Sequence, residues 1–366
     1  MQAEAAAKGP VYSREVLDRV GGALWGLFIA DALAMPTHWF YGGTRQVQQM
    51  YGGPIKGYVT PIKELPGSIM NLSNTGGGGR GGDRGDIIGT VINHGKKQYW
   101  TRQGQYHYHC TLSKAENTLE ATLVRLVCQS ISENGGAFQA EDMRKRYMDF
   151  MQTPGSHNDC YASTCHRMFF ANLKRGTPPE KCPDNDGHNV DTMDGLILGL
   201  PVGLATLGLP FEEAAKSVRS CTAVTRNTPV LASYEGHLLT ILRDLLAGTP
   251  LRKALETNAG RQLEDVVQSA SRREDPVVAC YISSNYPSLI HFASKYADDF
   301  EGGLLANTNC GGENVHRGCV LGALLGAHVG EAQIPAHLKD ELHDAELIRK
   351  QIEAFKSSLG KLTSTM

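Results

Sequence analysis

The stretch GGALWGLFIADALAMP, residues 21–36, decides the expected fold. It is apolar except at Asp31, and Pro36 bounds it, so it falls short of the roughly 18 residues that a membrane span needs. Gly22 and Gly26 lie four residues apart and therefore share one face of a helix. A second helix can approach closely along that face, or a ligand can lie against it. We take helix packing as the first interpretation, which predicts a buried core helix.

The same glycine spacing recurs in two other apolar stretches. Gly318, Gly322 and Gly326 lie within NTNCGGENVHRGCVLGALLGAHVG, residues 307–330. A third set is Gly195, Gly199 and Gly203. Inside a helix, Gly is less stable than Ala by roughly 1 kcal/mol. Repeated glycines at helical spacing therefore indicate faces where something must come close.

Helical periodicity dominates most of the remaining chain. The predicted helices are 13–34, 113–133, 140–151, 158–175, 190–206, 211–222, 228–247, 262–272, 286–297, 312–330 and 337–358. Alternating aromatic and polar residues within 86–111 suggest one short hairpin. Strands and helices do not alternate as they do in nucleotide-binding parallel sheets. We predict an all-α, compact multi-helix fold.

The domain organisation follows from the same pattern. One domain is expected over residues 13–360, with an insertion at about 40–111 and a flexible N-terminus at 1–12. Within the insertion, residues 76–85 are a Gly-rich, low-complexity loop that lacks the Gly-Lys-Ser/Thr ending of a phosphate-binding P-loop.

Composition excludes several classes of function. The chain has 366 residues with 36 Lys+Arg and 38 Asp+Glu, a formal charge of −2. It therefore lacks the basic excess that general nucleic-acid or anionic-membrane binding requires. A hydrophobic content of 41% argues against a disordered chain. Nine Cys without a Cys-x-x-Cys pair predict no disulfide framework and a cytoplasmic location, while the oligomeric state stays open.

Two predicted helices begin with the same polar pair. Glu116 and Asn117, followed by Thr118, open one helix, and Glu313 and Asn314 open another. Either pair alone is an ordinary capping pattern. Together they suggest two halves of one site, and carboxylate and amide oxygens suit a hard cation such as Mg²⁺.

Other polar residues near helix ends are weaker candidates. Asp31 within an apolar helix is costly unless it is capped, paired or bound to a metal. Asp194 heads a Gly-spaced apolar run and either lines a pocket or simply begins a helix. His107 and His109 would share one face of a strand, but a zinc site needs further ligands that the sequence does not place.

The order of these segments resembles the ADP-ribosylglycohydrolase family, which includes dinitrogenase-reductase-activating hydrolases and J1 crystallins. The segments that carry the resemblance are ADALAMP (30–36), AENT (115–118), DGLILGLP (194–201), TRNTP (225–229) and GGENVH (311–316). The resemblance implies an all-α fold with a dinuclear Mg²⁺ centre. It also implies hydrolysis of a glycosidic bond to ribose in an ADP-ribosyl compound.

This sequence departs from the family in the metal motifs. Four carboxylates in the family correspond here to two, Glu116 and Glu313, while Val315 offers no ligand atom. Two carboxylates would compensate the charge of two divalent cations poorly, so we expect one Mg²⁺ rather than two. A site without any metal is the alternative that stays open. Some members carry a catalytic Glu just after the opening proline, and His38 lies near that position here.

The predicted site combines the residue patterns with the resemblance. The predicted catalytic residues are Asp31, Glu116 and Glu313. The predicted substrate contacts are His38, Asp194, Gly195, Gly311, Gly312 and Asn314. The predicted metal ligands are Glu116, Asn117, Thr118, Glu313 and Asn314. We expect the glycine backbone at 311–312 to let the substrate approach closely.

Three functions remain open from the sequence. The first is an ADP-ribosylglycohydrolase-like hydrolase that acts on a small or protein-linked ADP-ribosyl substrate. The second is a non-catalytic crystallin-like or ligand-binding protein. The third is an enzyme of the same fold that acts on an unrelated small substrate. None of them involves a nucleic acid or a membrane as partner.

Overall fold

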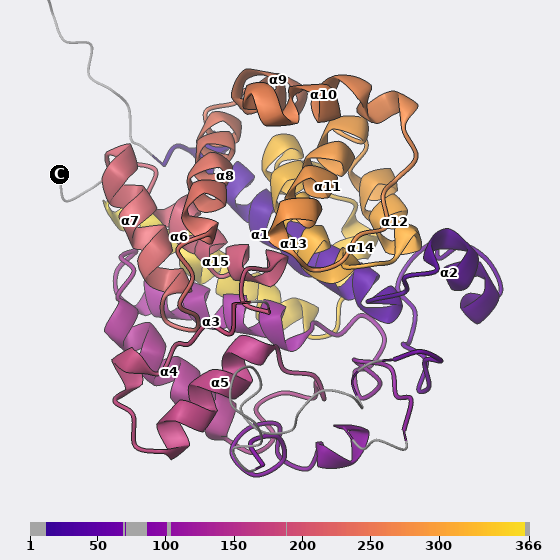
Figure 1. The fold of residues 1–366 in the computed structure, drawn as a ribbon. Coiled ribbons are helices and arrows are strands. Elements are labelled where there is room, and N and C mark those ends of the chain that lie inside the picture. Colours follow the sequence, from indigo (N-terminus) through magenta and orange to yellow (C-terminus); the bar gives the residue numbers. More distant parts are fainter. Residues whose placement is uncertain (1–11, 69, 71–85, 101–103, 188, 363–366) are drawn as a thin grey trace, which may run out of the picture.

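The computed structural model describes residues 12–68, 70, 86–100, 104–187 and 189–362. These residues form fifteen α-helices and several short 3₁₀ helices, with isolated β-bridges and no sheet among them (Figure 1). The all-α prediction is confirmed. The predicted flexible residues 1–12, apart from Tyr12, and the Gly-rich loop 76–85 lie outside the described residues.

The helices follow one another along the whole chain. The first seven are α1 (Arg14–Ala34), α2 (Gly43–Tyr51), α3 (Leu119–Glu133), α4 (Ala140–Gln152), α5 (Thr164–Lys174), α6 (Gly199–Ala205) and α7 (Phe211–Thr222). The next four are α8 (Leu231–Leu246), α9 (Leu251–Asn258), α10 (Gly260–Ser269) and α11 (Ile282–Lys295). The last four are α12 (Phe300–Cys310), α13 (Asn314–Val329), α14 (Ala336–Asp340) and α15 (Ala345–Leu362).

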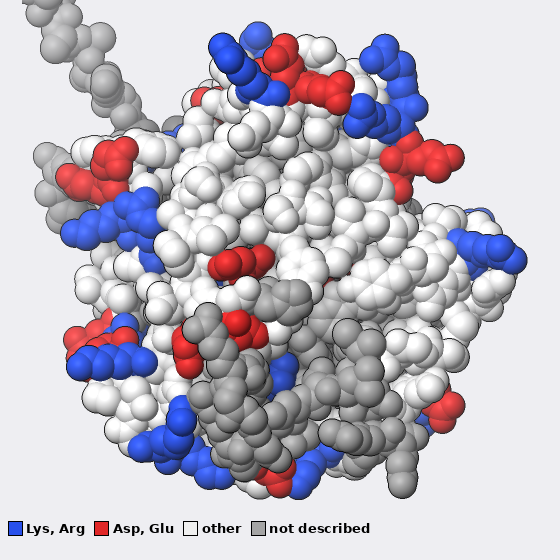
Figure 2. Space-filling view, in the orientation of Figure 1, with Lys and Arg blue, Asp and Glu red and all other residues white. Residues whose placement is uncertain are grey.

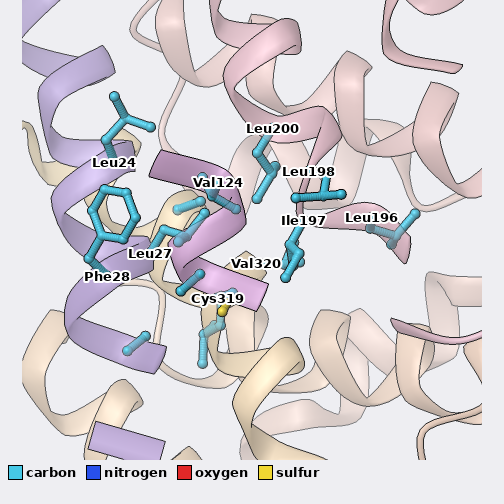
Figure 3. Packing of buried hydrophobic residues seen from close by; sticks show 14 of the residues in the cluster. Leu24, Leu27, Phe28, Val124, Leu196, Ile197, Leu198, Leu200, Cys319 and Val320 are labelled. Carbon is cyan, nitrogen blue, oxygen red and sulfur yellow. The ribbon is translucent and has the colours of Figure 1, made fainter. Parts of the chain in front are cut away.

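Helix α1 is the centre of the core. Ser13 caps its N-terminus by accepting a hydrogen bond from the Val16 amide at 3.3 Å. The stretch Arg14–Thr37 is long and apolar enough to cross a membrane by length and composition, but its apolar window is entirely buried inside the protein. Figure 3 shows Leu24, Leu27 and Phe28 of α1 among apolar side chains of α3, α6 and α13.

The glycine spacing joins α1 to α13. A Cβ atom added at Gly26 would lie 1.9 Å from the carbonyl oxygen of Gly322, and one at Gly22 would lie 2.2 Å from that of Gly326. Side chains at these positions would push the two backbones apart. The packing interpretation of these glycines is therefore the one that the structure supports, and the two helices lie side by side in Figure 1.

The expected hairpin within 86–111 is wrong for the described part of that segment. The 3₁₀ helix Lys97–Trp100 and isolated bridges replace it. The backbone of residues 105–107 pairs with residues 63–65 instead, through the Leu65 amide to the Gln105 oxygen at 2.7 Å and the His107 amide to the Lys63 oxygen at 2.9 Å. Trp100 and Tyr108 are buried and anchor this segment in the core.

Several predicted helices begin or end elsewhere. The helix expected at 190–206 is the 3₁₀ helix η5 (Met193–Leu196) followed by α6. The helices expected at 113–133 and 158–175 begin only at Leu119 and Thr164. The residues that precede these two helices are mostly irregular, and some of them carry polar side chains to the site described below.

Charged side chains of both signs are mixed over the face of the molecule seen in Figure 2. Neither sign dominates that face, in agreement with the formal charge of −2.

Candidate functional site

Glu313 occupies the N-cap position of α13, directly after a sharp turn. Gly311 and Gly312 have φ of 68° and 66°, which glycine adopts without strain. This turn directs the Glu313 side chain into the protein, where it is fully buried. Its Oε2 accepts a hydrogen bond from Trp39 Nε1 at 2.5 Å. Its Oε1 lies 3.1 Å from His38 Nε2 and 2.7 Å from Nδ1 of His316.

A continuous row of buried polar groups leads away from Glu313. His38 Nδ1 lies 2.6 Å from His109 Nε2. His109 Nδ1 lies 2.9 and 3.0 Å from the two oxygens of Asp159. Asp159 also accepts a hydrogen bond from the Leu119 amide, at the start of α3, at 2.9 Å. We call Asp159, His109, His38 and Glu313 the buried row.

Burial and charge set the protonation of the groups around Glu313. Burial alone would raise the pKa of Glu313, but His316 and His38 outweigh it and hold that pKa well below its usual range. Burial would lower the pKa of His316, but Glu313 raises it to about 10. For His38, burial dominates and lowers the pKa to about 4. As long as no cation is bound there, Glu313 and His316 therefore carry opposite charges, and His38 is neutral.

Glu313 and His316 lie in the wall of a pocket with a volume of about 160 Å³. Aromatic, acidic and basic side chains face the same space. The lining residues are Trp39, Tyr41, Tyr108, Tyr161, Ser163, Thr164, Arg167, Asn189, Thr192, Asp194, Ala279, Cys280, Tyr281, Glu313 and His316. The Trp39 ring meets the rings of Tyr108 and Tyr161 edge to face, at centroid distances of 4.3 and 5.0 Å. The pocket thus combines flat apolar walls with buried charges.

Asp194 is the second carboxylate of this pocket. It comes from η5, and its Oδ2 accepts a hydrogen bond from Arg226 at 3.1 Å, while the Thr192 hydroxyl donates to Oδ1. Burial would raise the pKa of Asp194, but Arg226 and His316 lower it, so the side chain is ionised. Its neighbour Gly195 has a packing role, because a Cβ atom there would lie 2.2 Å from Leu231 Cδ1.

Asp31, Asn117 and Thr118 are hydrogen-bonded to one another, and this contact, which we call the joint, connects two helices. Asp31 accepts hydrogen bonds from the Thr118 amide at 2.8 Å, the Thr118 hydroxyl at 2.7 Å and the Asn117 amide group at 3.0 Å. The joint ties the end of α1 to the start of α3, and burial raises the pKa of Asp31. None of the three residues lines the pocket beside Glu313.

Glu116 does not join Glu313. Its side chain accepts hydrogen bonds from the Ser113 amide at 2.7 Å and from Asn158 at 2.8 Å. It lines a different depression together with residues such as Arg125. The capping bond to Ser113 turns the carboxylate back along the chain, so the predicted pair of Glu116 and Glu313 is not formed.

Asn314, Gly311 and Gly312 contact residues 37–40 of the chain rather than the pocket. The Asn314 amide group donates to the Thr37 hydroxyl at 2.7 Å, and the Gly312 oxygen accepts from the Trp39 amide at 2.8 Å. A Cβ atom at Gly311 would lie 2.4 Å from the carbonyl oxygen of Phe40. The close approach expected at these glycines is made by the segment that carries His38 and Trp39, which positions both side chains at Glu313.

The donor atoms near Glu313 can be compared with the expected Mg²⁺. Ligand atoms of His38, Glu313 and His316 all lie within 4.8 Å of one another, so this buried group could bind a metal ion. Two imidazole nitrogens and one carboxylate oxygen do not suit Mg²⁺, which prefers oxygen ligands. Among the five predicted Mg²⁺ ligands, only Glu313 lines the pocket. Asn117 and Thr118 bind Asp31, Glu116 lies in the other depression, and Asn314 binds Thr37. A dinuclear Mg²⁺ centre does not fit these residues.

Sequence reasoning missed much of this site. His109 was set aside for lack of partners, and Asp159, Trp39 and His316 were not selected. Asp159, His109 and Trp39 reach Glu313 from segments far apart in the chain, with no shared spacing that could have revealed them. His316 lies only three residues after Glu313, and that helical spacing was a signal for the pair. The family resemblance gave a second signal at His38.

Fold and site together define an all-α protein in which a glycine turn before α13 presents an acid to a pocket. The family model for ADP-ribosylglycohydrolase matches residues 13–365, and the chain belongs to this family. A solved structure described as an "ADP-ribosylglycohydrolase-related protein complex" is similar, with a TM-score of 0.60 and 19% identity, over 95% of this chain and 100% of that one. A comparison with curated proteins found no match.

Proposed function

We propose that this protein hydrolyses a glycosidic bond to ribose in an ADP-ribosyl compound or an ADP-ribosylated protein. Family membership supports the class of reaction. The observation that carries the proposal is the pair of carboxylates, Glu313 and Asp194, that line one aromatic pocket. This pair takes the place of the Glu116–Glu313 pair expected from the sequence.

Two ionised carboxylates suit this chemistry because positive charge develops on the ribose as the glycosidic bond breaks. Asp194 is held ionised by Arg226, so it can stabilise that charge without taking up a proton. Glu313 accepts a hydrogen bond from the attacking water and orients it toward the sugar. Both carboxylates are buried, where their field is screened less than at the surface.

The rest of the pocket suits the remainder of such a substrate. Trp39, Tyr108 and Tyr161 offer flat faces and edges to a base. Arg167 lines the same pocket and supplies a positive charge for phosphate oxygens. Aromatic walls and a cation are therefore next to the carboxylates that act on the ribose.

The direct test is turnover by the purified full-length protein. ADP-ribosyl-arginine, ADP-ribosyl-serine and α-NAD⁺ are incubated with it separately, and released ADP-ribose is measured by chromatography. We expect cleavage of at least one of these compounds and a higher melting temperature in the presence of ADP-ribose. Absence of cleavage together with an unchanged melting temperature would refute the proposal.

A specific observation favours one other function, a binding protein without turnover. Glu313 already has four nitrogen neighbours, one each from Trp39 and His38 and two from the ring and backbone of His316. A carboxylate surrounded in this way is stabilised in its resting state. Under this alternative, ADP-ribose raises the melting temperature while all three compounds remain intact.

A further inference from the structure

One contact of the buried row lacks a proton to form a hydrogen bond. This becomes clear when the ring N–H protons of the two histidines are assigned. Asp159 can only accept, so the proton of a neutral His109 lies on Nδ1, facing Asp159. His109 Nε2 is then an acceptor, and the proton of a neutral His38 lies on Nδ1, facing His109. His38 Nε2 is left with a lone pair that faces Oε1 of Glu313 at 3.1 Å.

Two acceptors that face each other in a buried site repel, and a separation of 3.1 Å leaves no room for a water between them. His38 and Glu313 are both fully buried. The row therefore needs one more positive charge, supplied either by a proton shared along the histidines or by a metal cation between His38 and Glu313.

His316 distinguishes these two ways of supplying the charge. Its Nδ1 lies 2.7 Å from the same Glu313 oxygen, yet it makes no contact of hydrogen-bond geometry with any atom of the described residues. A proton on the histidines of the row would satisfy the His38–Glu313 contact and leave Nδ1 of His316 unchanged. A cation that all three residues share satisfies both contacts at once.

We propose that His38 Nε2, His316 Nδ1 and Glu313 Oε1 form a mononuclear site for a borderline-soft divalent transition metal, of which Zn²⁺ is the best match. Two histidines and one glutamate, with a fourth position left open, are a donor set of catalytic zinc sites. Glu313 and His316 line the pocket, so the open position faces it.

The groups behind the ligands support this assignment. A histidine that binds a metal usually donates its other ring N–H to an acceptor that fixes its orientation. Here His109 accepts from His38 and is itself oriented by both oxygens of Asp159. Trp39 fixes the second oxygen of Glu313 at 2.5 Å, and the His316 backbone amide holds the first, at 3.4 Å, where it faces both imidazoles.

The metal site goes beyond the proposed hydrolysis and does not require it. If both are correct, the metal would hold the attacking water that Glu313 orients, since a bound metal lowers the pKa of its water. Binding is measured without substrate, so a protein that binds Zn²⁺ but cleaves nothing keeps this inference and refutes the hydrolase.

The experiment titrates chelator-treated, dialysed full-length protein with Co²⁺, Zn²⁺ and Mg²⁺ in separate series. We expect one equivalent of Co²⁺ to give the visible absorption of a four- or five-coordinate site, and Zn²⁺ to displace it. Millimolar Mg²⁺ should not displace it. Absence of stoichiometric Co²⁺ or Zn²⁺ binding, or displacement by Mg²⁺, would overturn the proposal in favour of a proton.

Variants locate the metal. His316→Gln should weaken binding by more than the roughly tenfold to hundredfold loss expected for a residue behind the ligands, such as His109→Gln. Glu116→Gln is the matched control, since it removes a carboxylate from the family's other metal motif, and it should bind as the wild type does. Unchanged binding in folded His316→Gln would contradict the site. If that variant does not fold, anomalous diffraction from wild-type crystals soaked in Zn²⁺ decides whether the metal lies between these three atoms.

Discussion

Glu313 shows how the environment of one residue determines what it can do. Its carboxylate is fully buried, and it is tolerated only because Trp39, His38 and His316 surround it. Replacing a buried ionic partner leaves the other charge unpaired. Glu313 must therefore be tested with a measurement of folding beside any measurement of activity.

Asp275 provides a test of electrostatics outside the pocket. Burial would raise its pKa, but hydrogen bonds from His291, Lys295 and Tyr296, at 2.9, 2.8 and 2.7 Å, lower it from 3.8 to about 2. A carboxylate with a lowered pKa in the folded state stabilises the protein above its unfolded pKa, and this stabilisation is lost as the pH falls toward the folded pKa.

We expect Asp275→Asn to lower the free energy of unfolding by about 1.5 kcal/mol at neutral pH. The difference from wild type should shrink as the pH falls from about 5 toward about 2, because the wild-type carboxylate then becomes protonated. Urea unfolding of both proteins at several pH values measures this difference. A difference that stays constant over this range would show that the charge of Asp275 is not the cause.

At the scale of elements, the contact between α1 and α13 holds the two halves of the site in register. Helix α1 leads into the segment that carries His38 and Trp39, and α13 begins beside Glu313. The two backbones touch at glycines. The helices can therefore lie this close only because these positions carry no side chain.

We expect Gly26→Ala to lower the free energy of unfolding by about 3 kcal/mol, because its Cβ would lie 1.9 Å from the Gly322 oxygen. Gly236→Ala in α8 is the matched control, since its nearest neighbour, Phe211 Cζ, lies 4.0 Å away. That variant should gain about 0.5–1 kcal/mol from the better helix propensity of Ala. Chemical unfolding compares the two, and equal effects would contradict the close-packing interpretation.

Local patterns predicted the elements where one helix face decides the structure. The apolar face of α1 and the glycines of α13 made both helices visible in the sequence. The break between η5 and α6, with Pro201 in the first turn of α6, was not visible because apolar residues continue across it. Residues 105–107 were read as part of a hairpin, yet their partners at 63–65 lie about 40 residues away in the chain.

The same limit applies to the site. Glu313 and Asp194 follow from helix starts, which a sequence shows directly. The roles of Glu116 and Glu313 could not be separated, because both open a helix with the same Glu-Asn pair. The capping bond to Ser113 sends one carboxylate away from the pocket, while the turn at Gly311 and Gly312 sends the other into it.

At the scale of the whole molecule, the chain belongs to the ADP-ribosylglycohydrolase family and shares the fold of a related solved structure. Two histidines and a tryptophan surround Glu313. His38 and Trp39 reach Glu313 from the segment after α1, so the fold, rather than one sequence motif, makes this environment.

The comparison of Glu313→Gln with Glu116→Gln tests the central claim most directly. We expect Glu313→Gln to lower kcat/KM for the preferred ADP-ribosyl compound by about a hundredfold or more, with circular dichroism showing that the variant is folded. Glu116→Gln should stay close to wild type, because its carboxylate lies outside the pocket. Wild-type turnover by folded Glu313→Gln, or loss of turnover in Glu116→Gln alone, would contradict the account.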